Sequence, residues 1–124
     1  MSQQTGVLDI TLKAAADLRN YQYRIVYVSA ADSVTFATSA TTVAIGILQN
    51  DPNQYEAAVV RVLGTSKIKM EDAESRGAMI TASATGMGVS ADADKNWVIG
   101  TLLEASTTTG DIVEILISRF KASI

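Results

Sequence analysis

The chain has 124 residues, of which 48% are hydrophobic and 19% are charged, so it is long enough and apolar enough to bury one core. It contains no cysteine and no histidine, which excludes disulfides, thiol chemistry, histidine-based triads and most zinc or copper sites. The net charge is −3 and the ten Lys and Arg residues are scattered, so no nucleic-acid partner is expected. Residues 1–6 are polar and uncharged, and no apolar run reaches about 18 residues, so neither a signal peptide nor a membrane partner is expected.

Alternating apolar and polar residues predict β-strands along the whole chain. Such runs cover residues 8–12, 24–29, 43–48, 58–63, 67–70, 98–103 and 111–118. The segments between them are rich in Gly, Asn, Asp, Ser and Thr, which form turns. Turns spaced roughly 8–15 residues apart are typical of a sandwich or barrel. We therefore predict one mostly β domain over residues 1–124, a small β-barrel with residues 1–6 as a flexible N-terminal arm.

Only two stretches could be helical, and both are short. Residues 12–20 contain an alanine-rich run that fits either a short helix or a loop. Residues 71–76 place acidic side chains first and Arg76 last, and Gly77 follows, an order that favours a single helical turn. One or two short helical turns are therefore expected within the β fold.

The chain also contains a possible internal repeat. When it is shifted by 54 positions without gaps, residues 44–48 fall on residues 98–102, each with an Ile-Gly pair, and Val59 falls on Val113. The pattern predicts two similar β-units, residues 24–64 and 78–118, each with a hairpin, an Ile-Gly strand, a loop and a closing strand. The alternative is that short β-strands resemble one another by chance.

Two motifs copy part of a ligand-binding loop. Residues 86–91 match the spelling of a dinucleotide loop, but a turn follows where that loop needs a helix to hold the pyrophosphate. Asp92, Asp94 and Asn96 match the first three ligand positions of a calcium loop, but Trp97 and Leu103 replace the required glycine and glutamate. Both segments are interpreted as turns, and no cofactor and no metal are expected.

No group of residues predicts catalysis. Glu71, Asp72 and Glu74 lie among basic residues, which is typical of a solvated turn rather than of an acid–base pair. Residues 65–67 (Thr-Ser-Lys) supply the residue types of a Ser–Lys pair, but neighbours on a strand point to opposite faces. Trp97 and the four tyrosines favour core edges or interfaces, and no basic residues interleave them as base stacking would require.

Four segments carry a family resemblance, namely residues 44–50, 56–67, 98–105 and 110–117. They hold the two Ile-Gly strands and the valine-rich or isoleucine-rich strands that follow them. Through these segments the chain, over about residues 9–118, resembles a family of small proteins encoded among the head genes of tailed phages. These are the capsid decoration, or cement, proteins, and some members of the family carry a mistaken recombinase label.

The resemblance implies a small β-barrel or β-tulip that forms a homotrimer, binds the outside of the expanded phage head and bridges neighbouring major capsid subunits. It also implies synthesis in the host cytoplasm and a final location on the capsid exterior of the virion. In some relatives an N-terminal arm adds a strand to the capsid, and the equivalent arm here would be residues 2–12. The alternative is a head-fibre base or a surface glycan-binding virion module, and an enzyme is not expected. The candidate capsid contacts are Thr5, Gly6, Val7, Leu8, Asp9 and Ile10.

Overall fold

The computed structural model describes residues 7–93 and 96–122, and every regular element among them is a strand. The mostly β prediction is therefore confirmed. The predicted flexible arm, residues 1–6, lies outside the described residues. The strands are β1 (Leu8–Ala14), β2 (Ile25–Ala30), β3 (Ser33–Phe36), β4 (Ala44–Leu48), β5 (Ala57–Lys69), β6 (Met79–Ala82), β7 (Gly88–Ser90), β8 (Trp97–Leu102) and β9 (Ile112–Lys121).

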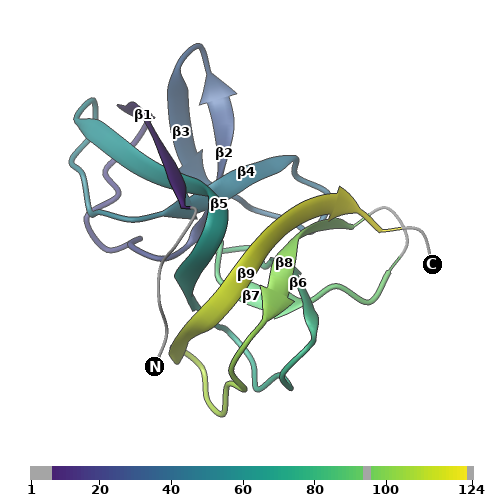
Figure 1. Ribbon diagram of the computed structural model, residues 1–124. Helices are drawn as coiled ribbons and strands as arrows, with labels where there is room; N and C mark the ends of the chain where they lie inside the picture. Colours follow the sequence, from purple (N-terminus) through teal and green to yellow (C-terminus); the bar gives the residue numbers. More distant parts are fainter. Residues whose placement is uncertain (1–6, 94–95, 123–124) are drawn as a thin grey trace.

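The first five strands close into a β-barrel. Their order is β1-β3-β2-β4-β5, and an antiparallel pairing between β1 and β5 closes the ring. All its neighbours are antiparallel except β1 and β3, which are parallel and pair only through Lys13 and Ala14. Alternation along these strands turns one side chain in two towards the interior. The small-barrel prediction is confirmed (Figure 1).

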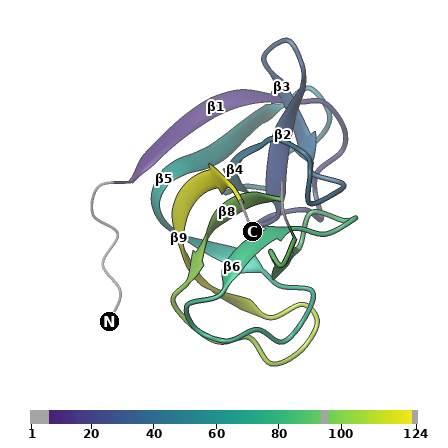
Figure 2. The same cartoon turned by 90° about the vertical axis from the view of Figure 1, so that its right-hand side faces the viewer.

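β5 continues out of this barrel and becomes the first strand of a second unit. Its Leu63 is the last residue paired with β1, and its Gly64 is the first residue paired with β9. Gly64 has a φ of 95°, a conformation that glycine adopts without strain. The second unit has the order β5-β9-β8-β6-β7, and a bridge from Met70 to Gly88 links its far edge back to the end of β5. Figure 2 shows β5 and β9 curving side by side below β1.

The two units repeat the same backbone hydrogen bonds. The Tyr23 N–H donates to the Leu48 carbonyl at 2.8 Å, and 54 residues later the Gly77 N–H donates to the Leu102 carbonyl at 2.8 Å. The Ala15 N–H donates to the Val34 carbonyl at 2.8 Å. The matching bond in the second unit runs from the Glu71 N–H, 56 residues after Ala15, to the Gly88 carbonyl, 54 residues after Val34, at 2.9 Å. In this arrangement β2, β3 and β4 correspond to β6, β7 and β8, and β1 corresponds to the second half of β5. A common origin of the units by duplication stays a prediction.

The two units do not have separate cores. One buried cluster, which includes Val34, Leu48 and Val60, fills the first barrel. The larger cluster combines Ile25 and Ile47 of the first unit with buried residues of the second. Strands β2 and β4 therefore bury side chains on both faces, one facing each unit. The second-unit members of the larger cluster are Ile68, Met70, Ile80, Ala82, Ile99, Leu102, Val113, Ile115 and Ile117.

The expected helical turns are wrong for the described residues. Residues 12–14 belong to β1, and the Ala15 and Leu18 amides donate to Val34 and Pro52 instead of to the preceding turn of a helix. At residues 71–76, the Glu71 amide donates to Gly88 across the second unit. Because distant carbonyls satisfy these amides, tertiary pairing overrides the local preference for a helix.

Candidate functional site

The predicted capsid contacts lie at the start of β1 as far as the structure describes them. Thr5 and Gly6 lie outside the described residues. Val7 is half-buried just before the strand, and Leu8, Asp9 and Ile10 are its first three residues, all exposed. The structure therefore assigns part of the predicted arm to the barrel wall.

β1 has one paired edge and one largely open edge. From Leu8 to Lys13 it pairs antiparallel with β5. On its other edge only Lys13 and Ala14 pair with β3, so residues 8–12 face no second strand within the described part of the chain. Such an edge presents backbone N–H and C=O groups to which another extended segment can bond. β1 crosses the outside of the molecule above β5 (Figure 2).

An ion pair ties the start of β1 to β5. Arg61 donates through Nε to one Asp9 carboxylate oxygen at 2.8 Å and through a terminal nitrogen to the other at 3.1 Å. The Arg61 side chain is largely buried, and it also donates to the Thr65 carbonyl at 3.2 Å. The hydrogen bonds from Asp9 raise the pKa of Arg61 further above its usual value. This bidentate geometry holds β1 in register where the strand begins.

Two leucines form an exposed apolar pair beside that ion pair. Leu8 is opposite Leu63 in the strand register, and the two side chains are 51% and 54% exposed. Ile10 lies two residues along β1 and is 36% exposed. Leu63 and Arg61 were not among the predicted contacts, because the register that places them beside β1 is a tertiary property. Ile10 is opposite the buried Val60 and so belongs to the inner face of the barrel wall. The β1 surface, defined here as Leu8, Asp9, Arg61 and Leu63, can offer both apolar contact and backbone pairing.

The motifs that resembled ligand loops have structural roles. Gly86 lies in the turn between β6 and β7 with a φ of 80°, and no helix follows it. Ser66 is buried, donates to the Lys67 carbonyl at 2.8 Å and accepts from the Gln49 side chain at 2.9 Å, so its hydroxyl is already bonded. Asp94 lies outside the described residues.

In residues 7–93 and 96–122, no three or more acidic side chains gather in a way that could hold a metal ion. No helix in the same residues is long and apolar enough to cross a membrane.

Comparison with known proteins finds similarity among solved structures. No family model matches the chain, and no curated protein matches it. Among solved structures, the chain is similar to the head fiber gp8.5 N base in bacteriophage phi29, with a TM-score of 0.73 and 20% sequence identity. The match covers 95% of this chain and 99% of that one. The similarity shows that the two chains share their fold.

Proposed function

We propose that the chain is a structural protein of a tailed-phage head that binds the outer surface of the expanded capsid and bridges neighbouring major capsid subunits. The observation that carries the proposal is the whole-chain fold shared with a phage head-fibre base. The family resemblance in residues 44–50 and 98–105 supports the same location on the capsid exterior of the virion. A structural rather than enzymatic role fits a surface built from strand edges and apolar contacts.

The β1 surface is the proposed capsid contact. Its open backbone edge can receive a strand of the capsid, and Leu8 and Leu63 can cover apolar side chains beside it. Thr5, Gly6 and Val7 precede this edge in the sequence and would lengthen the edge with which the capsid strand pairs. A homotrimer would multiply three such contacts through their effective concentration. Binding only to the expanded shell would stabilise that shell by mass action.

A binding assay with isolated heads tests the capsid contact. Purified protein is mixed with expanded, undecorated heads, and the bound fraction is measured after sedimentation. We expect saturable binding, weaker binding to unexpanded shells, and a trimer by light scattering. Leu8→Ser should weaken binding by about tenfold or more, because a buried leucine contributes about 1.5–3 kcal/mol. Val28→Ser, a change at an exposed residue of β2, is the matched control and should bind normally. Equal loss in both variants, or no saturable binding, would refute the contact.

A head-fibre base is the second candidate, because the similar solved structure is described as one. Cryo-electron microscopy of decorated heads separates the two functions. A base predicts further density extending outwards above each bound copy, whereas a cement protein predicts density that ends at the barrel and contacts two or more capsid subunits.

A further inference from the structure

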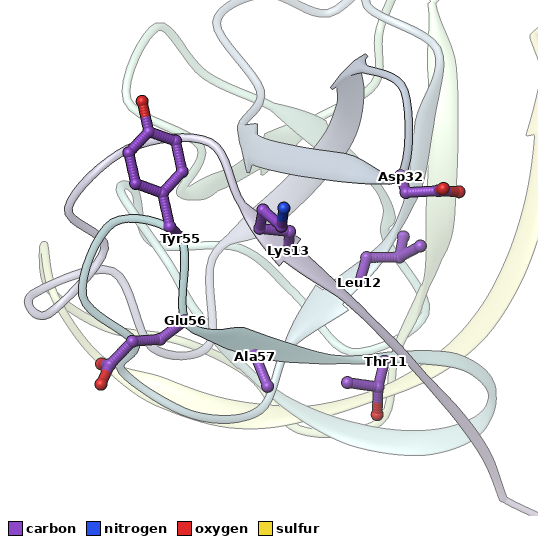
Figure 3. A pocket seen from close by; sticks show the side chains of 7 residues that line it. All are labelled: Thr11, Leu12, Lys13, Asp32, Tyr55, Glu56 and Ala57. Carbon is purple, nitrogen blue, oxygen red and sulfur yellow. The ribbon is translucent and has the colours of Figure 1, made fainter.

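An open pocket lies on the first unit, away from the Leu8–Leu63 pair. It occupies about 420 Å³ where the end of β1, the turn between β2 and β3 and the loop before β5 meet. Figure 3 shows the Tyr55 ring on one side, Lys13 in the middle and Asp32 on the other side. The Glu56 carboxylate points outwards at the edge of the view.

Tyr55 has a backbone conformation that its bulky side chain disfavours, whereas Asp32 has a similar φ in a turn that aspartate tolerates. Their φ angles are 69° and 55°, in the left-handed region that favours glycine. The Tyr55 side chain is 71% exposed. Within residues 7–93 and 96–122, no hydrogen bond or ion pair involves the side chains of Tyr55, Asp32 or Lys13. Nothing in the described fold therefore accounts for the presence of these two side chains.

The second unit shows that the backbone does not need them. The Tyr55 N–H donates to the Ala14 carbonyl at 2.8 Å, and its counterpart Gly110 donates to Met70 at 2.7 Å with a φ of 90°. The counterpart of Asp32 is Gly86, with a φ of 80°. Glycine supports the same turns in the second unit without strain, so the first unit carries a strained tyrosine at residue 55 that folding alone would not favour.

We propose that this pocket binds a pyranose ring of a saccharide. An exposed aromatic face can stack on the apolar C–H face of a sugar, and Tyr55 supplies one. Sugar hydroxyls both donate and accept hydrogen bonds, and Lys13 can donate while Asp32 can accept. The pocket lining combines the Lys13 ammonium group with the Asp32 carboxylate, a charge balance that suits a neutral ligand better than a phosphate.

The equivalent surface of the second unit cannot serve the same ligand. There Gly110 and Gly86 supply no ring and no carboxylate. The chain's own Tyr23 also covers part of it, because its carbonyl accepts a hydrogen bond from the Lys69 amide at 2.9 Å. The hollow on this surface, about 290 Å³, is smaller, and basic or polar side chains such as Arg19 and Gln22 line it together with Tyr23, without a carboxylate.

Saturation-transfer NMR on the full chain tests the proposal. The probes are the methyl glycosides of glucose, galactose, rhamnose and N-acetylglucosamine at millimolar concentration. We expect at least one probe to bind, and Tyr55→Gly to weaken it about tenfold because the stacking face is lost. The melting temperature of Tyr55→Gly should stay the same or rise, because glycine relieves the strained φ. Tyr23→Gly is the matched control, since it changes a tyrosine with a φ of 67° elsewhere and should leave binding unchanged.

Three results would overturn the proposal. These are no saturation transfer to any of the four probes, a lower melting temperature for Tyr55→Gly, and a change in oligomeric state with that variant. The second would show that the ring stabilises the fold, and the third would show that a protein segment occupies the pocket. Capsid binding by Tyr55→Gly should equal that of the wild type, so failure here is distinguishable from failure of the proposed function.

Discussion

The two units of this molecule have one backbone pattern but different side chains at its turns. In the second unit the left-handed positions are Gly77, Gly86 and Gly110. The same positions in the first unit hold Tyr23, Asp32 and Tyr55. Because the hydrogen bonds of Tyr23 and Tyr55 match those of Gly77 and Gly110 to within about 0.1 Å, the second unit shows what these turns require for folding alone.

The units also differ in how their first strand begins. β1 begins the first unit as a separate strand with an open edge, whereas its counterpart is the second half of the 13-residue β5. Covalent continuity through Gly64 therefore holds the second unit against the first. The features proposed for capsid and saccharide contact both belong to the first unit. This is the unit with an open strand edge and with larger side chains where the second unit has glycine.

The largest expected loss of stability comes from substituting the equivalent glycines of β4 and β8, the central strands of the two units. A Cβ added at Gly46 would overlap the Arg61 carbonyl oxygen, and one added at Gly100 would overlap the Leu116 carbonyl oxygen. We expect Gly46→Ala and Gly100→Ala each to cost about 3 kcal/mol or more of unfolding free energy, because backbone must move in both cases. Urea denaturation measures this loss. A large loss at only one of the glycines would break the equivalence of the units.

The shared core predicts that the units unfold together. Ile47 belongs to the first unit but packs in the cluster of the second, so Ile47→Ala should cost about 2–5 kcal/mol. The unfolding transition should stay single by circular dichroism and by Trp97 fluorescence. Val34→Ala, in the cluster of the first barrel alone, is the comparison and should also keep one transition. Two separated transitions in either variant would show that the units are independent.

The sequence predicted strand content well where strands are long and alternate. Residues 8–12, 43–48 and 98–103 lie on β1, β4 and β8 to within a few residues. The pattern split β5 into two strands, because Gly64 changes the strand's partner and twist without ending it.

Short strands and contacts between distant residues could not be predicted in the same way. The predicted runs do not include β3, β6 or β7, which have only three or four residues each. In β7, Gly88 has no alternating signal and is held by packing on the Met70 sulfur. The pairing of Leu8 with Leu63 depends on a register that local residues do not specify. The pocket residues Lys13, Asp32 and Tyr55 are far apart in sequence, and none of them belongs to a recognisable motif.

The turn glycines give a smaller effect that separates backbone strain from crowding. Nothing lies within 4 Å of a Cβ added at Gly77, so Gly77→Ala should cost about 1 kcal/mol through its φ of 83° alone. At Gly86 the added Cβ would also lie 3.0 Å from the Phe36 Cβ, so Gly86→Ala should cost about 2 kcal/mol. Urea denaturation measures both losses of unfolding free energy. Equal losses would mean that Phe36 moves away from the added methyl group at little cost.

The smallest effect is a pH dependence that arises in the second unit. Asp111 accepts hydrogen bonds from the amides and hydroxyls of Thr107 and Thr108, and these bonds lower its pKa from 3.8 to about 2. A carboxyl whose folded pKa is lowered stabilises the fold above its unfolded value, and this contribution is lost as the pH falls from about 3.8 to about 2. Asp111→Asn should therefore be less stable than the wild type at pH 5, and the difference should shrink across that window.

Thr107→Val sharpens this last prediction, because it removes one hydroxyl donor at 2.8 Å and leaves the carboxylate in place. With fewer hydrogen bonds to its charged form, Asp111 should have a pKa closer to 3.8. Acid destabilisation should then begin at the same pH as in the wild type, because the unfolded pKa sets its onset, but it should be smaller and should be complete at a higher pH. The measurement is the melting temperature of the wild type, Asp111→Asn and Thr107→Val at half-unit steps of pH. Superimposable profiles for wild type and Asp111→Asn would mean that this loop contributes no pH dependence. The difference between the units would then be confined to the left-handed turns and the open edge of β1.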